Sequence, residues 1–465
     1  MRWHGKEPGG KNAHDRTQQK QTGETEVNSE KIKVKKKARN EGRPGYKKTK
    51  VGWIPEEWEC VRLRNLGDGV RPAIKAGPFG SSLKKEYYVK NGYKIYGQEQ
   101  VISGDPFCGD YFIDEKRFES LRSCEVLPGD ILLSLVGTIG KAMLIPPDYQ
   151  KGIINPRLLR ISLSKNRISS LYVKYYLEAE HTLSLLSNWS QGGTMGVLNA
   201  QIVGALPIPL PPLPEQKKIA EILSAWDRAI EQVGKLIDAK ERLKKGLTQQ
   251  LLTGRMRFPE FGKPVEKKDQ LPEGWEKIRA KKMFVRRSIK NCGKETVLSV
   301  TQDIGVIPRD VLDRKINMTD SNTDTYKLVE PGDFVISLRS FQGGIEYSNH
   351  RGIVSPAYHV IRPIVKVDND FYRHYFKSSE FVGHIAIAVI GIRDGKQINY
   401  DDFAFLKFPY PPVAEQTRIA AVLSTCDREI ELLKKKLEKL KEQKKGLMQK
   451  LLTGEIRVKA KERDS

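Results

Sequence analysis

Three short stretches of this 465-residue chain carry residue types that catalytic sites use, but their spacing does not fit the chemistry. A phosphate-binding loop needs four residues between its two glycines. Residues 137–141 (GTIGK) have only two, which favours a tight turn over contact between backbone amides and phosphate. Asp114, Glu115 and Lys116 are the residue types of a metal-dependent nuclease, but they are consecutive, as is typical of solvated surface. Residues 146–149 (PPDY) contain the letters of the amino-methyltransferase tetrapeptide in the wrong order.

Other catalytic patterns are absent as well, so the sequence predicts a protein without its own catalytic centre. No dinucleotide-binding GxGxxG pattern follows a strand-like segment, and no nucleophile with its base can be assigned from the scattered residues. Five cysteines are dispersed without a CxxC pair, and the seven histidines do not cluster with them, which argues against a disulfide framework or a zinc site. We expect a soluble protein of a reducing, cytoplasmic compartment, since no apolar run approaches the length of a membrane span. A self-contained nuclease or methyltransferase remains the enzymatic alternative.

The charge balance indicates a polyanionic partner. The chain has 81 Lys and Arg against 57 Asp and Glu, a net charge of +24. The first 50 residues contain 15 of the basic and 6 of the acidic residues, so most of the excess lies in the rest of the chain. Nucleic acid is the favoured partner, with a membrane surface or an acidic protein as alternatives.

One long stretch occurs twice and must position everything else. Residues 211–257 begin PPLPEQKKIAEIL and end LLTGRMR, and residues 411–457 begin PPVAEQTRIAAVL and end LLTGEIR. The two copies align without a gap at an offset of 200, with about half of their positions identical. Residues 215–252 and 415–452 contain no proline and are followed by Gly254 or Gly454 as a C-cap, which predicts two helices of roughly 55 Å.

Apolar residues in both helices recur in alternating steps of three and four, as in a coiled coil. Lys244 and Lys444 interrupt the two seams at equivalent positions. We predict that the helices pair with each other as an intramolecular antiparallel coiled coil, with the two remaining domains at its ends. The alternative is that each helix packs only on its own domain, although such a length exceeds a domain of about 150 residues.

The segments before the helices are also duplicated, but they have diverged. Pro128-Gly129-Asp130 matches 331–333, residues 152–156 match 352–356, and residues 171–176 match 371–376. Short strand-like runs precede a helix in each copy, which predicts an α+β fold with two pseudo-repeated α/β domains separated by the long helices. We expect a disordered basic tail (1–45), a first domain (46–210), a first helix (211–254), a linker (255–270), a second domain (271–410), a second helix (411–454) and a C-terminal tail (455–465).

Taken together, these motifs closely resemble the specificity subunit of type I restriction-modification systems. The resemblance runs from about residue 46 to residue 457 and rests on the two PPxxEQ…LLTG helices, WIPEEW at 53, GPFGSS at 77, GTIGK at 137, SLRSFQGG at 337 and GIVSPAY at 352. It implies two target-recognition domains that each read one half of a split DNA site, with the helices setting the gap. It also implies that methyltransferase and motor-nuclease subunits join the chain, and that S-adenosylmethionine, ATP and Mg²⁺ belong to those partners. No cofactor or metal is expected in this subunit.

Candidate base and phosphate contacts lie in the divergent loops. Amide and basic side chains are favoured because Gln pairs with adenine and Arg or Lys with guanine, whereas phosphate contacts supply affinity. The candidates are Ser81, Ser82, Lys84, Lys85, Gln98, Gln100, Lys141, Arg157, Arg339, Ser340, Gln342, Tyr358, Arg393 and Lys396. Each is equally compatible with a structural or solvated role, and Tyr358 with a place in the core.

The outer faces of the helices are the candidate docking surfaces for the catalytic partners, through Asp227, Arg228, Asp427 and Arg428. Solvated, ion-paired surface is an equal interpretation of these four residues. A coiled-coil scaffold that joins proteins without touching DNA is the third functional hypothesis. The recognised DNA sequence does not follow from the residues, because base readout depends on loop geometry and DNA shape.

Overall fold

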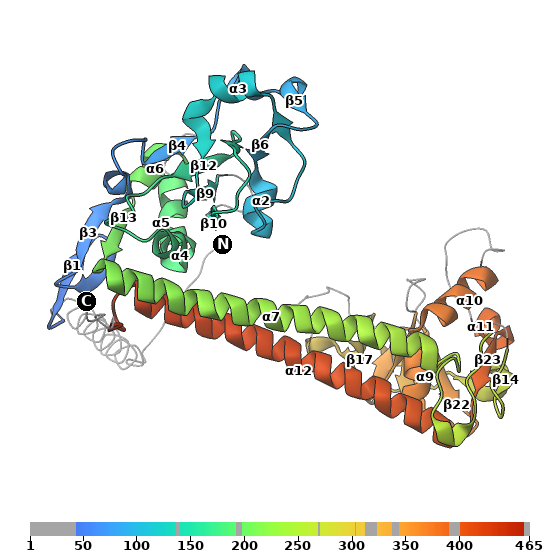
Figure 1. Ribbon diagram of the computed structural model, residues 1–465. Helices are drawn as coiled ribbons and strands as arrows, with labels where there is room; N and C mark the ends of the chain where they lie inside the picture. Colours follow the sequence, from blue (N-terminus) through green and yellow to red (C-terminus); the bar gives the residue numbers. More distant parts are fainter. Residues whose placement is uncertain are drawn as a thin grey trace, which may run out of the picture. The chain divides into compact units, whose positions relative to one another are not determined.

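A computed structural model describes residues 43–135, 140–191, 198–267, 270–302, 304–311, 323–336, 344–389 and 400–459. The chain forms two compact units: unit 1 combines residues 1–229 with residues 440–465, and unit 2 comprises residues 230–439. The tail predicted for residues 1–45 lies almost wholly outside the described residues. Both units mix helices with short strands (Figure 1), which confirms the α+β class.

Unit 1 contains two main sheets. One is antiparallel with strand order β10-β9-β12-β4, and the other has the order β5-β7-β6-β11-β8, with β6 and β11 parallel. The strands are β1 (Tyr46–Thr49), β2 (Gly52–Pro55), β3 (Glu59–Arg62), β4 (Ile74–Ala76), β5 (Tyr88–Val89), β6 (Tyr93–Tyr96), β7 (Phe112–Ile113), β8 (Glu125–Val126), β9 (Ile131–Ser134), β10 (Ala142–Leu144), β11 (Gly152–Ile154), β12 (Leu158–Ile161) and β13 (Pro207–Leu210). The helices that precede the long one are α2 (Gln98–Ser103), α3 (Glu115–Ser120), α4 (Ser170–Glu178), α5 (Glu180–Gln191) and α6 (Ala200–Ala205).

Unit 2 repeats the first of these sheets with the order β15-β22-β19-β20. Its strands are β14 (Glu276–Arg279), β15 (Phe284–Arg287), β16 (Leu298–Thr301), β17 (Gly305–Pro308), β18 (Lys327–Val329), β19 (Phe334–Ile336), β20 (Ile345–Tyr347), β21 (Gly352–Val354), β22 (His359–Pro363) and β23 (Lys407–Tyr410). Its short helices are α8 (Ala280–Met283), α9 (Asn369–Tyr375), α10 (Ser379–Val389) and α11 (Tyr400–Phe405). The strand pair β14–β23 corresponds to β3–β13 of unit 1, so the duplicated frame predicted from the sequence is present in the structure.

The repeated stretches form α7 (Leu213–Leu251) and α12 (Val413–Leu452), which run side by side (Figure 1). Gln216 fixes the start of α7: its side-chain oxygen accepts from Ser169 N at 2.9 Å, and its amide donates to Pro211 O. The predicted glycines follow the ends of both helices, and Gly254 and Gly454 adopt φ values of 71° and 72°, which favour glycine.

Within each unit, parts of the two long helices run antiparallel to each other. Lys444 pairs with Asp227 in unit 1, and in unit 2 Lys240 meets Glu429 at 2.7 Å. The end of each helix also packs into the core of the other unit. Leu451 of α12 lies in the main core of unit 1, whereas Leu251 of α7 lies in that of unit 2. The alternative in which each helix packs only on its own domain is therefore excluded, and the antiparallel pairing is confirmed.

Candidate nucleic-acid interface

Three predicted contact residues of unit 1 lie together at the end of β9. Gln98 donates from Nε2 to Ser134 Oγ at 2.8 Å. Lys141 is joined to the same residue, because its carbonyl accepts from Ser134 N at 2.9 Å, and the carbonyl of Arg157 accepts from Leu135 N at 3.0 Å. Lys141 and Arg157 are exposed and Gln98 is half-buried, so two exposed cationic residues and an amide lie near one strand end.

A glycine brings the GPFGSS loop close to the same strand end. A Cβ atom at Gly77 would lie 1.9 Å from the carbonyl oxygen of Asn155, so only glycine allows the two backbones to approach so closely. The loop then presents Phe79, which is 76% exposed, ahead of Ser81 and Ser82. We define the β9-end surface as Phe79, Gln98, Lys141 and Arg157.

Phe79 was absent from the sequence-based candidates, although its place between two glycines was a signal. An exposed aromatic ring suits stacking or wedging against bases. Lys84 and Lys85 follow on the same segment, around the 3₁₀ helices Gly80–Leu83 and Lys85–Tyr87, and both are exposed.

The prediction that Gln100 reads DNA is wrong for this conformation. Gln100 is 1% exposed, its side-chain oxygen accepts from Gly97 N at 2.7 Å, and its amide donates to Cys108 O at 2.6 Å. The side chain caps α2 and is fully occupied. Sequence alone could not distinguish it from Gln98, because their exposure depends on which side of α2 faces the sheet.

In unit 2 only Tyr358 of the predicted contacts lies within the described residues; Arg339, Ser340, Gln342, Arg393 and Lys396 lie outside them. Tyr358 is half-buried against a small apolar core that includes Val329 and Val360. Its carbonyl accepts from the buried Lys327 Nζ, which also donates to Pro356 O at 2.6 Å. Lys327 thus holds the backbone of the loop at 355–358 in place.

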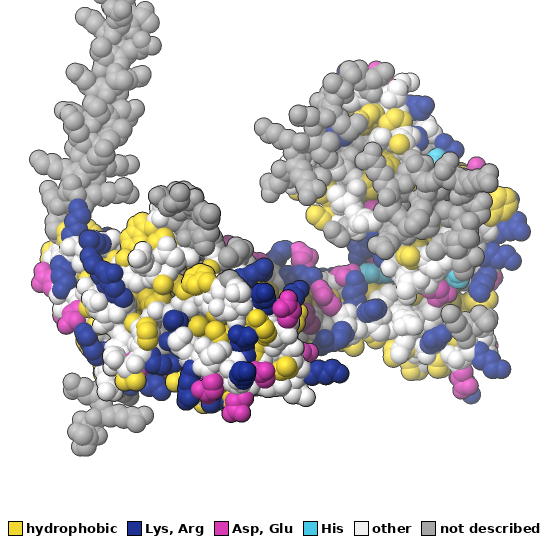
Figure 2. All heavy atoms as spheres, turned by 90° about the horizontal axis from the view of Figure 1, so that it is seen from above, with side chains coloured by type: hydrophobic (Ala, Val, Ile, Leu, Met, Phe, Trp, Pro, Cys, Tyr) yellow, Lys and Arg dark blue, Asp and Glu magenta, His cyan; other side chains and the backbone are white. Residues whose placement is uncertain are grey.

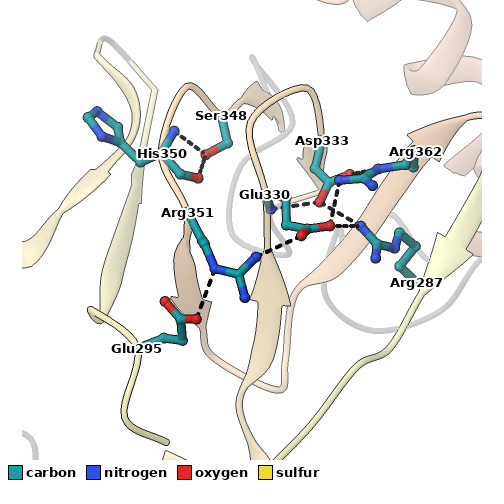
Figure 3. Close-up of polar contacts among 8 residues, drawn as sticks. All are labelled: Arg287, Glu295, Glu330, Asp333, Ser348, His350, Arg351 and Arg362. Atoms are coloured by element: carbon teal, nitrogen blue, oxygen red, sulfur yellow. Dashed lines mark hydrogen bonds and ion pairs between the residues drawn. The ribbon is translucent and has the colours of Figure 1, made fainter. Parts of the chain in front are cut away.

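A charge-balanced ion network supports the strand ends of unit 2 (Figure 3). Its members are Arg287, Glu295, Glu330, Asp333, Arg351 and Arg362. Asp333 is fully buried, accepts from Glu330 N at 2.8 Å and pairs with Arg362 Nε at 2.6 Å. Hydrogen bonding from Arg287 lowers the pKa of Glu330, which keeps that carboxylate charged. Because the arginines are matched by carboxylates, we assign the network to stabilising the scaffold rather than to binding phosphate.

Asp130 plays the same part in unit 1, where it is 2% exposed and pairs with Arg71 at 2.9 Å. It also accepts from Leu127 N at 2.8 Å, as Asp333 does from Glu330 N. The repeated Pro-Gly-Asp turns therefore position β9 and β19 rather than contribute chemistry. Lys and Arg side chains are interspersed with acidic, neutral and hydrophobic ones on the visible surface of each unit (Figure 2), so charge alone does not mark the interface.

The docking role of Asp227 and Asp427 stays a prediction, and both carboxylates make contacts within their own units. Asp227 accepts from Tyr175 Oη at 2.7 Å and pairs with Lys444 across the helix pair. Asp427 pairs with Lys244 in the equivalent way. Arg228 and Arg428 are exposed and remain predicted contacts.

His374 adds a buried titratable group beside Asp427. Its Nδ1 lies 3.8 Å from the Asp427 carboxylate, and its Nε2 lies 3.1 Å from Ser424 Oγ. Burial lowers the pKa of His374 to about 4, with Arg373 and Lys244 acting in the same direction and Asp427 and Asp368 opposing them. The imidazole is therefore neutral at physiological pH.

Residues of the repeated PPxxEQ and LLTGxxR motifs form a buried ion pair with a tryptophan. We call this group a lock, and sequence reasoning did not assign it. Glu415 of the second PPxxEQ motif is fully buried and accepts from Arg257 Nε and Nη2 at 2.9 and 2.8 Å. Trp275 Nε1 donates to the same carboxylate at 2.8 Å. Arg257 ends the first LLTGxxR motif, so the end of α7 is fixed to the start of α12 within unit 2.

Unit 1 contains the reciprocal lock. Glu215 accepts from Arg457 Nε and Nη2 at 2.8 and 2.9 Å, and Trp58 Nε1 donates to it at 3.3 Å. The recurrence of Trp, Glu and Arg in both copies was the available signal. The sequence could not show that the Glu of one copy pairs with the Arg of the other, because this pairing depends on the antiparallel arrangement of the two helices.

Within the described ranges, no group of three or more His, Cys, Asp or Glu side chains is arranged to hold a metal ion.

Sequence comparison identifies the family to which the chain belongs. The type I restriction modification DNA specificity domain matches residues 55–241 and again residues 272–442. The chain belongs to this family. Its curated relatives are named as specificity subunits, which are the noncatalytic components of type I restriction enzymes, and this confirms the noncatalytic assignment.

Two relatives come from Methanocaldococcus jannaschii. The putative type I restriction enzyme MjaX specificity subunit is 28% identical over 89% of this chain and 97% of its own length. The MjaVIII specificity subunit is 26% identical over 87% of this chain and 94% of its own length. Both alignments span nearly the whole relative, including both repeats.

A solved structure supports the fold. It is described as the structural basis of complex assembly and conformational transition of the type I R-M system, and it matches 87% of this chain and 99% of its own with a TM-score of 0.52 at 16% identity. In the part of this specificity subunit that the structure describes, no helix is both long and apolar enough to span a membrane.

Proposed function

We propose that this subunit directs a type I restriction-modification complex to a bipartite DNA site, with each recognition domain reading one half. The observation that carries the proposal is the paired repeat: two related sheets in units 1 and 2, each followed by a long helix that pairs antiparallel with the other. A duplicated scaffold with divergent loops can bind two different half-sites in the same manner.

In unit 1, the β9-end surface supports the DNA contact. Lys141 and Arg157 supply cations for phosphates or guanine, Gln98 supplies an amide for adenine, and Phe79 supplies a ring. The loop around Lys84 and Lys85 extends the same segment of chain.

The long helices are proposed to set the gap between the half-sites. Each remains helical across the boundary between units, which falls after Ala229 in α7 and after Lys439 in α12. A helix lengthens by about 1.5 Å per residue, so helix length is a direct way to fix a spacing.

Methyltransferase subunits are proposed to dock on an exposed leucine strip of the helix pair in unit 2. Leu236, Leu243 and Leu432 expose 45%, 50% and 60% of their surface. Each immediately precedes a seam position, so in an antiparallel pair all three lie on the same flank. Ser424 and Asp427 immediately follow seam positions and face His374 of α9, so the strip lies on the flank away from α9.

The charges around the strip suggest the partner's chemistry. Arg242 and Lys436 are exposed near it, as is Lys235, which pairs with Glu231 at 2.6 Å, so a second copy of this face would bring Arg242 and Lys436 against like charges. An amphipathic helix with an apolar stripe and acidic flanks fits better. S-adenosylmethionine, ATP and Mg²⁺ are proposed to act in the methyltransferase and motor-nuclease subunits.

Exchange of residues 46–205 for the first domain of another family member tests the proposal. Methylome sequencing of the host should show that one half of the modified motif changes, whereas the other half and the gap stay the same. A change in both halves, or in neither, would contradict it. The unchanged chain, expressed in the same host, is the control.

A further inference from the structure

Unit 1 contains a partly open cavity that the proposed function does not use. It has a volume of about 260 Å³ and lies where the start of α5 meets the last turns of α12 and the β1–β2 hairpin. Its walls include Ile54, Tyr176, Pro209, Met448 and Leu452. The volume exceeds the roughly 150 Å³ that accommodates benzene in an apolar cavity, but it is below the usual size of a small-molecule site. The space therefore suits a single large side chain.

Unit 2 shows what fills the equivalent place in the repeat. Its helix α10 buries Phe381, which packs on Phe376, Tyr375 and Phe408 with ring centroids 4.9 to 5.6 Å apart. Phe376 corresponds to Tyr176, which lines the cavity in unit 1.

Burial shows which residue of unit 1 replaces that phenylalanine. Helix α10 buries Phe381 and Ile385, whereas α5 buries Thr182 and Leu186, again four residues apart. Thr182 therefore takes the place of Phe381. The smaller side chain leaves space where unit 2 has a ring.

The hydrogen-bonding capacity of the Thr182 hydroxyl is also poorly satisfied at this position. It is fully buried, and its hydroxyl makes no hydrogen bond of normal geometry within the described part of the chain. The adjacent Tyr176 hydroxyl donates instead to Pro207 O at 3.0 Å. A buried polar atom beside an apolar space indicates a site that is incomplete in the isolated chain.

The rim allows entry and carries both signs of charge. Lys445 and Glu180 pair across it at 2.9 Å, and their side chains are 61% and 68% exposed. Exposed ion pairs contribute little to stability, so this pair can separate readily. An apolar floor with a charged rim is the form of a pocket that anchors one residue of a protein partner.

We propose that this cavity receives an aromatic side chain of a docked methyltransferase subunit, in the manner in which Phe381 fills unit 2. The inference rests on the proposed function for the identity of the partner. Residues on either side of the inserted ring would pair with Lys445 and Glu180. A small aromatic molecule and a second copy of this chain are the other possible occupants.

Filling the cavity from within tests the proposal in the full-length chain. Thr182→Phe copies unit 2, and Thr182→Leu is a smaller alternative that still fills space if the ring does not fit. Thr182→Val is the matched control, since it removes the hydroxyl but keeps the shape. Thermal unfolding, with and without toluene as a probe, reports whether the space is filled, and titration with the methyltransferase subunit reports affinity.

The expected result is a Tm for Thr182→Leu at or above that of the wild type, no further rise with toluene, and at least about tenfold weaker binding of the methyltransferase subunit. Thr182→Val should bind the subunit as the wild type does. Equal affinity in all variants would overturn this inference and leave the proposed function intact. If the wild-type chain fails to bind the methyltransferase subunit, both are overturned, and if it self-associates through this cavity, a second copy is the occupant instead.

Discussion

At the residue scale, the arginines of the two locks differ in their exposure to solvent. Arg257 and Glu415 are 1% and 0% exposed, whereas Arg457 and Glu215 are 36% and 6% exposed. Removing one partner of a buried ion pair leaves an uncompensated charge, and that penalty grows with burial. The two locks consist of the same three residue types, but we expect them to contribute unequally to the free energy of unfolding.

Arg257→Ala should destabilise unit 2 by about 3–5 kcal/mol, because Glu415 would stay buried and charged. Arg457→Ala should cost less in unit 1, since water can reach its position. Denaturant unfolding of the full-length variants measures both. Arg418→Ala, which removes an exposed pair with Glu260, is the control and should change the free energy of unfolding by less than about 1 kcal/mol. Equal losses for Arg257 and Arg418 would contradict the assignment of the lock.

The β9-end surface makes a prediction about salt. Lys141→Gln and Arg157→Gln should each weaken DNA binding and, where the side chain contacts a phosphate, lower the slope of log K against log salt by about 1. Fluorescence anisotropy across a salt series measures this, with Lys116→Gln, an exposed lysine on α3, as the control. Unchanged affinity and slope in both variants would remove this surface from the interface.

At the element scale, the pairing of α7 and α12 decides which polar residues lie in the seam between the helices and which lie on the free faces. Lys244 and Lys444 interrupt the apolar seam, and each meets an aspartate of the other helix. Charged pairs within an otherwise apolar seam favour one register over others. The helix faces that remain free are then defined by packing, and the leucine strip is one of them.

Leu236→Glu combined with Leu243→Glu should weaken binding of the methyltransferase subunit by about thirtyfold or more, because both side chains lie in the proposed docking strip. Circular dichroism should show that helix content is retained, since neither residue lies in the seam. Asp238→Ala, an exposed change on the other flank of α7, is the control. Undiminished binding by the double variant would place the partner on another surface.

At the scale of the whole molecule, the proposed role of the helices is a matter of length. Insertion of seven residues after Lys235 and after Lys435 keeps the spacing of the seam and lengthens both helices by about 10 Å. The gap between the half-sites should grow by about three base pairs, since B-DNA rises about 3.4 Å per pair. Methylome sequencing of the host reads this directly.

A seven-residue insertion in the linker at 255–270 is the control, and it should leave the gap unchanged. A constant gap after lengthening both helices would show that they do not set it. Loss of all modification, with the two units still folded, would instead locate the effect in partner docking.

The sequence by itself determined the repeat, the two long helices, their capping glycines and the absence of a recognisable catalytic centre, because these depend on local propensity and periodicity. It also placed Lys141 and Arg157 among the candidates from residue type alone. Only the tertiary structure decided how exposed each glutamine is: Gln98 is half-buried, whereas the buried Gln100 caps α2. It also showed that Asp227 and Asp427 contact Lys444 and Lys244, because the register of two antiparallel helices depends on both helices.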